Sequence, residues 1–216
     1  ERHMLEGVSM IDPENTYIED GVSIGRDSII YPGAIITGGS SIGEDCIIGE
    51  NTRIEDCVVG DGVEIYSSTI EESIIGEGCT IGPYARIRPG SSLGRDIGIG
   101  HFVEVKNSTL GDGTKAAHLA YIGDADVGKD VNIGCGVIFV NYDGKSKART
   151  RIEDSAFIGS NSNLIAPVIV KRKGYVAAGS TIIDEVGEGC LSIARARQVN
   201  KHGWVEQREK EGRNKL

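Results

Sequence analysis

The sequence predicts an all-β solenoid, a parallel β-helix built from short repeated turns. Aliphatic residues recur at every sixth position, as in Ile24, Ile30 and Ile36. Glycine often follows the aliphatic residue directly; the chain contains 31 glycines, while aromatic residues make up only 5% of it. A helix repeats every 3.6 residues and a simple strand every two. A period of six, with β-branched residues and turn-forming glycine, is therefore typical of hexapeptide coils.

The period of six extends over two long stretches of the chain, with three steps of five residues between Ile54 and Ile75. The expected inward-pointing aliphatic residues are Ile18, Ile24, Ile30, Ile36, Ile42, Ile48, Ile54, Val59, Ile65, Ile70, Ile75, Ile81, Ile87, Leu93, Ile99 and Val105, then Ile152, Ile158, Leu164, Val170, Val176 and Ile182. Three hexapeptides form one triangular coil, and each inward residue stacks on its equivalents in the neighbouring coils. Because neighbouring strands lie ~4.8 Å apart, roughly ten coils give a prism on the order of 45–50 Å long.

The two ends of the chain do not follow the repeat. Residues 1–14 are interpreted as a connector from a missing upstream domain, and residues 15–195 as the β-helix. Residues 196–216 are polar and contain the chain's one tryptophan, Trp204. We expect this last segment to be an extended tail that packs on a neighbouring subunit or frays.

Composition excludes several classes of protein. A net charge of −9 argues against a general nucleic-acid binder, which needs a basic face. No run of 18 apolar residues is present, so the sequence predicts no membrane span. Five cysteines without a CxxC pair indicate reduced, packed thiols in a cytoplasmic protein and no metal centre. No P-loop, GxGxxG or HExxH motif supports phosphoryl transfer or zinc hydrolysis.

Candidate functional residues concentrate where the repeat is interrupted, between Gly111 and Gly144. His118 lies where small alanines replace the inward aliphatic residue. A histidine titrates near neutral pH and can accept a proton from an amine. Tyr121 and Asn132 can hydrogen-bond to sugar hydroxyls. A surface or packed histidine is the alternative interpretation of His118, and the other histidines are interpreted as structural.

Two cations are expected to lie on one face of the prism. Arg88 directly follows the inward residue Ile87, so its side chain should face outward. Lys106 occupies the corresponding position about one coil later. This spacing lets a planar guanidinium and a compact ammonium reach one phosphate group. A solvated charged face is an equally compatible interpretation.

Three further basic clusters interrupt this acidic sequence. They contain Lys145, Lys147, Arg149 and Arg151; then Lys171, Arg172 and Lys173; and finally Arg195, Arg197 and Lys201. The first cluster belongs to the loop NYDGKSKART, which begins at Asn141 and Tyr142 and is otherwise compatible with an ordinary turn. We interpret the clusters as favouring a polyanionic ligand, such as coenzyme A, held in a groove.

The stretch from Ile81 to Trp204 carries seven longer motifs. They are IGPYARIRPG, FVEVKNSTLGDGTKAAHLAYIGDADVG, VNIGCG, VNYDGKSK, FIGSNSNLIAPV, VAAGST and IARARQVNKHGW. With these motifs the chain resembles the C-terminal acetyltransferase domain of the bacterial bifunctional GlmU enzymes, which pair a glucosamine-1-phosphate N-acetyltransferase with an N-acetylglucosamine-1-phosphate uridylyltransferase. The motifs cover more than half of the chain and are more specific than the hexapeptide repeat.

The resemblance implies a role for individual residues. His118 matches the general base. The residues matching sugar-phosphate ligands are Arg88, Lys106, Tyr121, Asn132 and Lys147. The residues matching acetyl-coenzyme A contacts are Cys135, Asn141, Tyr142, Ser160, Ala178, Arg195 and Lys201. Cys135 stands where the family often has alanine, a small change that leaves its backbone contact intact.

The resemblance also implies an activity and an assembly. The activity is acetyl transfer from acetyl-coenzyme A to glucosamine 1-phosphate, giving N-acetylglucosamine 1-phosphate for UDP-GlcNAc, peptidoglycan and lipopolysaccharide synthesis. The assembly is a homotrimer of left-handed β-helices with active sites between subunits, although parallel crossovers are generally right-handed. The uridylyltransferase domain and its Mg²⁺ are absent from this chain, as expected of a truncated or a naturally single-function form.

Three other classes of protein share parts of this pattern. Another hexapeptide acyltransferase would keep the repeat and a histidine, but not the RPG, KAAH and NYDG motifs together. A trimeric β-helix carbonic anhydrase needs three histidines around zinc, whereas only His101 and His118 lie in the body of the repeat. A non-catalytic β-helix scaffold would bind no coenzyme A.

Overall fold

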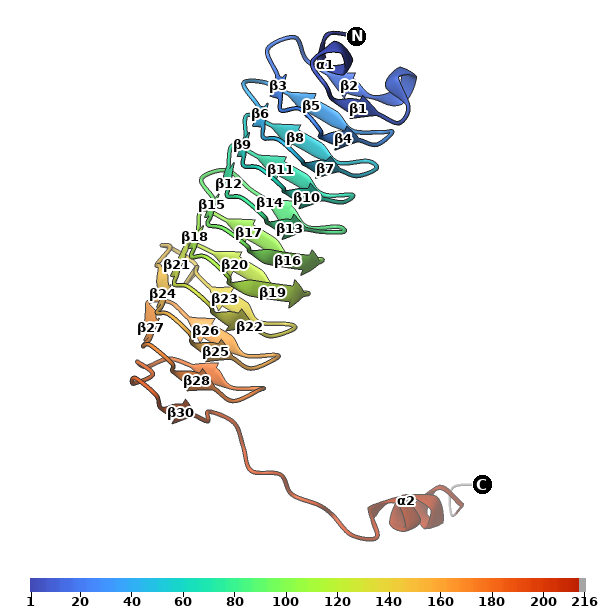
Figure 1. Cartoon of the computed structure of the whole chain (residues 1–216). Coiled ribbons are helices and arrows are strands. Elements are labelled where there is room, and N and C mark those ends of the chain that lie inside the picture. The colour runs from blue at the N-terminus through green and yellow to red at the C-terminus, as the bar shows by residue number, and fades with distance from the viewer. Residues whose placement is uncertain (214–216) are drawn as a thin grey trace.

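The computed structural model describes residues 1–213 and shows a long triangular prism of stacked coils (Figure 1). Helix α1 (Arg2–Leu5) lies at one end of the prism, next to the short 3₁₀ helix η1 (Pro13–Asn15). At the other end an extended segment leads away to helix α2 (Trp204–Arg213). The N-terminus and α2 therefore lie beyond opposite ends of the solenoid.

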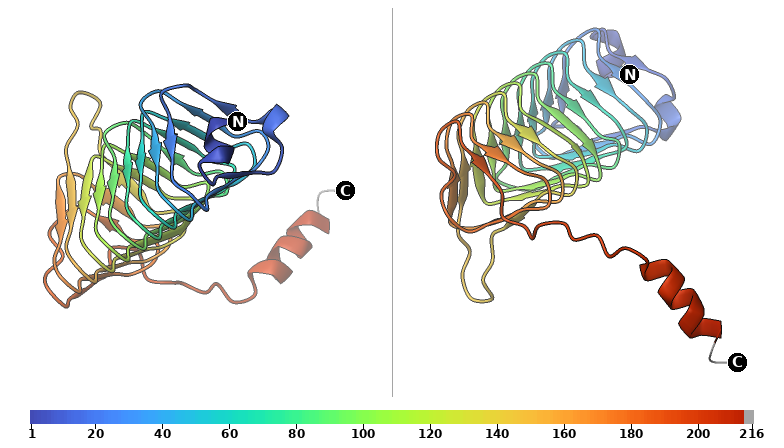
Figure 2. Two further views of the ribbon diagram at one scale, coloured as in Figure 1. Left: turned by 45° about the horizontal axis from the view of Figure 1, so that its top comes forward. Right: turned by 90° about the horizontal axis from the view of Figure 1, so that it is seen from below.

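Three parallel sheets form the faces of the prism (Figure 2). Sheet A consists of β1 (Ser9–Met10), β4 (Ile29–Ile30), β7 (Ile47–Ile48), β10 (Glu64–Ile65), β13 (Thr80–Ile81), β16 (Gly98–His101), β19 (Lys115–His118), β22 (Asn132–Ile133), β25 (Phe157–Ile158), β28 (Tyr175–Val176) and β30 (Leu191–Ser192). Sheet B consists of β2 (Tyr17–Ile18), β5 (Ile35–Thr37), β8 (Arg53–Glu55), β11 (Thr69–Glu71), β14 (Arg86–Ile87), β17 (Glu104–Lys106), β20 (Tyr121–Gly123), β23 (Ile138–Val140), β26 (Asn163–Ile165) and β29 (Thr181–Ile182). Sheet C consists of β3 (Ser23–Ile24), β6 (Ser41–Ile42), β9 (Val58–Val59), β12 (Ile74–Ile75), β15 (Ser92–Leu93), β18 (Thr109–Leu110), β21 (Ala125–Val127), β24 (Thr150–Ile152) and β27 (Val168–Val170).

Each coil contributes one strand to each sheet, and this confirms the predicted hexapeptide β-helix of about ten coils. Consecutive strands of one sheet are parallel and stay in register, so that Ile48, Ile65 and Ile81 follow one another. The coils wind in the left-handed sense that the family resemblance implied. The general preference for right-handed crossovers therefore does not hold here.

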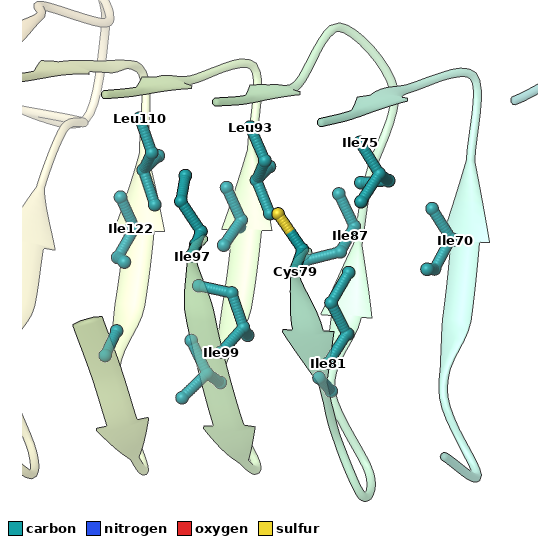
Figure 3. Close-up of a cluster of buried hydrophobic side chains, with 14 of the residues drawn as sticks. Ile70, Ile75, Cys79, Ile81, Ile87, Leu93, Ile97, Ile99, Leu110 and Ile122 are labelled. Carbon is teal, nitrogen blue, oxygen red and sulfur yellow. The ribbon is translucent and has the colours of Figure 1, made fainter. Parts of the chain in front are cut away.

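The core is a column of aliphatic side chains inside the prism. Figure 3 shows part of it, where Ile81, Ile87 and Leu93 point inward from three different faces. Every expected inward residue is buried except Ile18, which is partly buried in the first coil. The period of six thus identified the main aliphatic positions of the core. Except before Ile18, a second position, two residues before each of them, is also buried and usually holds a smaller residue such as Ala34, Cys46 or Val63.

The glycine after an inward aliphatic residue has a steric reason. At Gly60 a Cβ atom would lie 2.8 Å from the backbone nitrogen of Glu77 in the next coil. Real Cβ atoms do not approach backbone atoms so closely, so a larger residue here would push the coils apart. Glycine at this position therefore allows the ~4.8 Å spacing between strands.

The two ends differ in detail from the sequence expectation. Within residues 1–14, interpreted as a connector, Ser9 and Met10 already pair with Ile29 and Ile30. The hexapeptide pattern did not reveal this strand, because it contains Ser9 and Met10 where its partner strand has two isoleucines. In the tail, expected to be extended throughout, residues 204–213 form α2.

The largest interruption of the repeat is the loop of residues 141–149, between β23 and β24. It projects from the prism as a narrow hairpin (yellow in Figure 2), in which Tyr142 and Lys147 form an antiparallel bridge. The coils on either side remain paired, since β21 lies between β18 and β24 in sheet C. An insertion at a turn thus leaves the core intact.

Neither helix within residues 1–213 is long and apolar enough to cross a bilayer. All five cysteines are free thiols, as predicted. Cys46, Cys57 and Cys79 are buried, and burial raises the pKa of each thiol above its ordinary value. The prediction of packed thiols was wrong for Cys190, which is exposed because it lies in the last coil.

We predict that shortening one buried residue destabilises the protein far more than shortening its exposed neighbour. Ile75 is 1% exposed and Ile74, on the same strand, is 54% exposed. Ile75→Ala should lower the free energy of unfolding by about 2–5 kcal/mol through the lost burial and the cavity that remains. Ile74→Ala should change it by about 0.5 kcal/mol or less. Denaturant titration of both variants measures the difference, and equal losses would contradict the inward assignment.

We also predict unequal reactivity of the thiols. Because the thiolate is the reactive form, burial protects a cysteine both sterically and through its raised pKa. A thiol reagent at neutral pH should therefore modify Cys190 rapidly and leave Cys46, Cys57 and Cys79 unmodified until the protein unfolds. Mass spectrometry of modified peptides gives the assignment. Rapid labelling of those three cysteines in the native protein would disprove the packing described here.

Candidate active site

The sequence-predicted site residues fall mainly along the two long edges of the face formed by sheet B. We call the turns that lead from sheet A to sheet B the A–B edge, and those that lead from sheet B to sheet C the B–C edge. His118 lies on the A–B edge, at the end of β19, and Lys106 lies on the B–C edge, at the end of β17. Tyr121 begins β20 on the face between them.

On the A–B edge the predicted base and three predicted coenzyme contacts form one column. Three backbone hydrogen bonds connect successive turns there: Gly136 N–H to His118 C=O at 3.4 Å, Asn161 N–H to Cys135 C=O at 2.8 Å, and Gly179 N–H to Ser160 C=O at 2.8 Å. His118, Cys135 and Ser160 therefore follow one another from coil to coil, and Ala178 continues the column. The coil repeat brings together residues that are 60 positions apart in the sequence.

The A–B edge changes shape at His118. In the turn of His118 and the two turns before it, the position with a left-handed backbone holds Tyr84, Phe102 and Leu119, with φ of 61°, 56° and 49°. All three side chains are more than half exposed, and the rings of Tyr84 and Phe102 stack with centroids 5.4 Å apart. Bulky residues are rare in this conformation. In the following turns the same position holds Gly136, Asn161 and Gly179, so an exposed apolar ridge gives way to small or polar residues.

The imidazole of His118 is exposed and stacks on His101. The two histidines are paired across β16 and β19, and their ring centroids lie 5.8 Å apart. Within residues 1–213 the His118 side chain takes part in no hydrogen bond. His101 was interpreted as structural from the sequence, and the structure places it directly beside the predicted base.

The B–C edge carries a buried carboxylate with several donors. Asp124 is 5% exposed. The ammonium of Lys106 lies 3.3 Å from both of its oxygens, and the Asn107 amide donates to it at 2.6 Å. The Asn141 amide also donates to Asp124 and lies 3.4 Å from the Tyr121 hydroxyl. The Asp124 carboxylate thus holds together two predicted ligand residues, Lys106 and Asn141, and also binds Asn107, which follows Lys106 in the sequence.

The electrostatics of this cluster favour an ionised carboxylate. Burial alone would raise the pKa of Asp124, but the hydrogen bonds from Asn107, Asn141 and Lys106 outweigh it, so that the pKa lies below its ordinary value. One coil earlier, Arg88 donates to Glu104 at 2.8 Å, and this hydrogen bond raises the pKa of the guanidinium. Arg88 and Lys106 lie on the same face, as predicted, each with a carboxylate partner.

The projecting loop is fastened at both ends to the B–C edge. At its start, Asn141 donates to Asp124. At its end, Arg149 donates to Asp126 at 2.6 Å, to the Ala125 carbonyl at 3.0 Å and to the Asn107 carbonyl at 3.2 Å. Tyr142 and Lys147 lie on the exposed part of the loop.

Several predicted residues lie apart from both edges in a single chain. Asn132 is on the outer face of sheet A, paired with Lys115 and Phe157. Arg195 and Lys201 belong to the exposed segment that leaves the prism. One chain by itself therefore does not assemble the whole set of predicted ligands.

The basic clusters are less available to an anion than the sequence suggested. Arg149 pairs with Asp126, and Lys171 lies within 3.8 Å of both Glu153 and Glu185. Arg172 pairs with Glu188. A hollow of about 540 Å³ on the sheet C face is lined by such paired charges, including Arg151 and Glu153, and by none of the predicted ligands. The third cluster, in the tail, forms no ion pair among residues 1–213.

Sequence reasoning missed the acidic partners of the site, Asp124 and Glu104, and the amide of Asn107. A signal was present, because Asp124 follows Tyr121 by three residues and lies about one coil from Lys106. Carboxylates were not considered because the expected ligands are anionic. The structure shows that the cations needed for such ligands are held in place by buried or half-buried carboxylates.

Comparison with known proteins agrees with this architecture. The family model described as the GMPPB C-terminal domain matches residues 12–101. Among solved structures, UDP-N-acetylglucosamine acyltransferase from Francisella novicida aligns with a TM-score of 0.61 and 18% identity, covering 83% of this chain and 65% of that one. A structural alignment with so little sequence identity shows a shared fold alone.

Curated sequences give a much closer match. The bifunctional protein GlmU of Clostridioides difficile (strain 630) is 59% identical over 208 residues, which cover 96% of this chain and 45% of that protein. The bifunctional protein GlmU of Alkaliphilus oremlandii (strain OhILAs) is 62% identical over 207 residues, which cover 96% of this chain and 46% of that protein. The chain thus spans less than half of the length of these relatives. Similarity of this extent makes the chain a homologue of the C-terminal half of the GlmU proteins.

Proposed function

We propose that this chain transfers the acetyl group of acetyl-coenzyme A to the amine of glucosamine 1-phosphate. The observation that carries the proposal is the column on the A–B edge. There His118 is the first residue of a column that continues with Cys135, Ser160 and Ala178, residues that match coenzyme contacts of the family. A proton acceptor beside a path of small residues suits a thioester whose long pantetheine arm must lie against the protein.

His118 acts on the amine in this proposal. The amine of the sugar is mostly protonated at neutral pH, so the nucleophile is its free-base form. As that nitrogen attacks the thioester carbonyl, His118 takes a proton from it, a C–N bond forms and the C–S bond then breaks. Coenzyme A leaves as a thiolate and takes up a proton. The exposed imidazole, free of hydrogen bonds within residues 1–213, is open to such an exchange.

The backbone beside His118 offers a donor for the tetrahedral oxyanion. The N–H groups of Gly134 and Gly136 are occupied, since they donate to the carbonyls of Ile158 and His118. The N–H of Cys135 donates to no group among residues 1–213. It is therefore the member of this turn that can stabilise the developing negative charge.

The B–C edge supplies the phosphate side of the proposed site. Lys106 and Arg88 present an ammonium and a guanidinium on the same face, and each already has a defined orientation through its carboxylate partner. Contacts to the phosphate contribute binding energy away from the reacting carbon. Tyr121, Asn132 and Lys147 complete the proposed set of sugar-phosphate ligands.

The proposed active form is a homotrimer with sites between subunits. The predicted ligands lie on two edges, two sheet faces and a detached segment, so a second copy is needed to bring them around one substrate. Asn141, Tyr142, Arg195 and Lys201 are proposed to hold the nucleotide part of the coenzyme. The exposed ridge of Tyr84, Phe102 and Leu119 adjoins His118 and offers an apolar surface for the neighbouring subunit.

We predict that His118→Ala reduces kcat by about 10²–10⁴-fold, the usual contribution of a general base. The measurement is release of coenzyme A thiol from acetyl-coenzyme A in the presence of glucosamine 1-phosphate. His101→Ala is the matched control, because it removes the stacked imidazole one coil away; its kcat should change only a few-fold. Thiol release by both variants at the wild-type rate would keep the reaction and remove His118 from the role of base.

We predict further that activity depends on assembly. Specific activity should fall to background when the protein is diluted to the point at which sedimentation detects monomers, because no single chain contains the whole site. Thiol release and sedimentation at matched concentrations test this expectation. A monomer with full activity would disprove the shared site. A trimer that binds coenzyme A without acetylating glucosamine 1-phosphate would point instead to another acceptor.

A further inference from the structure

We propose that Asp124 is a positioning residue that sets Lys106 and Asn141 in one fixed geometry, and so links the sugar-phosphate and coenzyme parts of the site. The inference rests on the proposed function, because these two residues are the proposed ligands of different substrates. It goes beyond that function in assigning a role to a residue that contacts neither substrate.

The contacts of Asp124 span three successive coils. Lys106 comes from the end of β17 in the coil before it, and Asn107 follows in the same turn. Asn141 comes from the coil after it and is the first residue of the projecting loop. Asp124 itself has a left-handed backbone, with φ of 50°, in the turn that follows β20. It therefore lies between the two ligand residues along the prism axis.

The donors around Asp124 exceed what a structural turn needs. Asp61, at another turn of the prism, accepts a single backbone N–H bond, from Glu44. Asp124 instead accepts from three side chains and is 5% exposed. A buried carboxylate with this set of partners fixes the rotamers of long or flexible side chains. The Lys106 side chain therefore loses its conformational entropy on folding, and substrate binding does not have to order it.

A second clamp on the same loop provides a matched control. Arg149 fastens the other end of the loop through Asp126, and Asp126 makes no contact with Lys106. Asp126 is exposed, so its loss leaves no buried group without a partner. Asp124 and Asp126 thus both restrain the loop, whereas only Asp124 restrains the lysine.

The test variant is Asp124→Asn, which keeps the shape and replaces one accepting oxygen by a donor. That nitrogen would face the donors Lys106, Asn107 and Asn141, so at most part of the cluster can remain paired. We expect the KM for glucosamine 1-phosphate and the KM for acetyl-coenzyme A each to rise about ten-fold, the effect of losing one charge-assisted hydrogen bond. Asp126→Asn should leave the KM for glucosamine 1-phosphate unchanged.

Double variants show whether Asp124 acts through its partners. In a Lys106→Ala background, Asp124→Asn should raise the KM for glucosamine 1-phosphate no further. In an Asn141→Ala background, Asp124→Asn should raise the KM for acetyl-coenzyme A no further. A purely structural role would lower kcat through loss of folded protein and leave both KM values unchanged. That result, or full additivity of the single effects, would overturn the proposal.

Hydrogen exchange tests the positioning without reference to activity. The Ala148 N–H donates to the Asn141 carbonyl at 2.9 Å across the base of the loop. Its exchange should accelerate at least ten-fold in Asp124→Asn. If the wild-type chain does not acetylate glucosamine 1-phosphate, the proposed function fails, and faster exchange alone would still support the positioning of Asn141. Unchanged exchange would overturn the proposal whatever the activity.

Discussion

The fixed spacing between coils is the constraint on which the rest of this structure depends. Each inward aliphatic residue contacts its equivalents in the coils before and after it, and the close approach of backbones requires glycine at positions such as Gly60. The strands are therefore short and stay in register over the whole prism. Any side chain that points outward belongs to a column, and its neighbours in that column are fixed by the core and not by local sequence.

Function must use the outer surface of such a prism, because its interior is filled by apolar side chains and by a few hydroxyls that return their hydrogen bonds to the backbone. Ser28 is an example, since it donates to the Gly43 carbonyl and accepts from the Cys46 N–H. An unpaired polar group inside would cost on the order of 1–3 kcal/mol. Asp124 lies at the limit of this rule: it is buried, but its turn lets three side chains from adjacent coils satisfy it.

The sequence predicted the inward residues well because a strict period encodes them directly. It also placed Arg88 and Lys106 on one face, since 18 residues make one coil. The same spacing could have paired Lys106 with Asp124. It could not add Asn141, because that requires knowing which turns coincide after the repeat is interrupted. It likewise gave no sign that Asn132 and Tyr121 lie on different faces, or that residues 204–213 are helical, as that segment has no repeat to interpret.

The apolar ridge beside His118 bears on the proposed assembly of more than one chain. Tyr84, Phe102 and Leu119 each hold a left-handed backbone, at a cost of about 1–3 kcal/mol per residue, and each leaves its side chain exposed. In an isolated prism these three side chains remain largely in contact with water and contribute almost no buried apolar surface. A convex face also covers a ligand from one side only, whereas ligand sites bury most of their ligand. In the proposed trimer a second copy packed on the ridge would remove both difficulties, because it would bury these three side chains and place a second wall opposite His118.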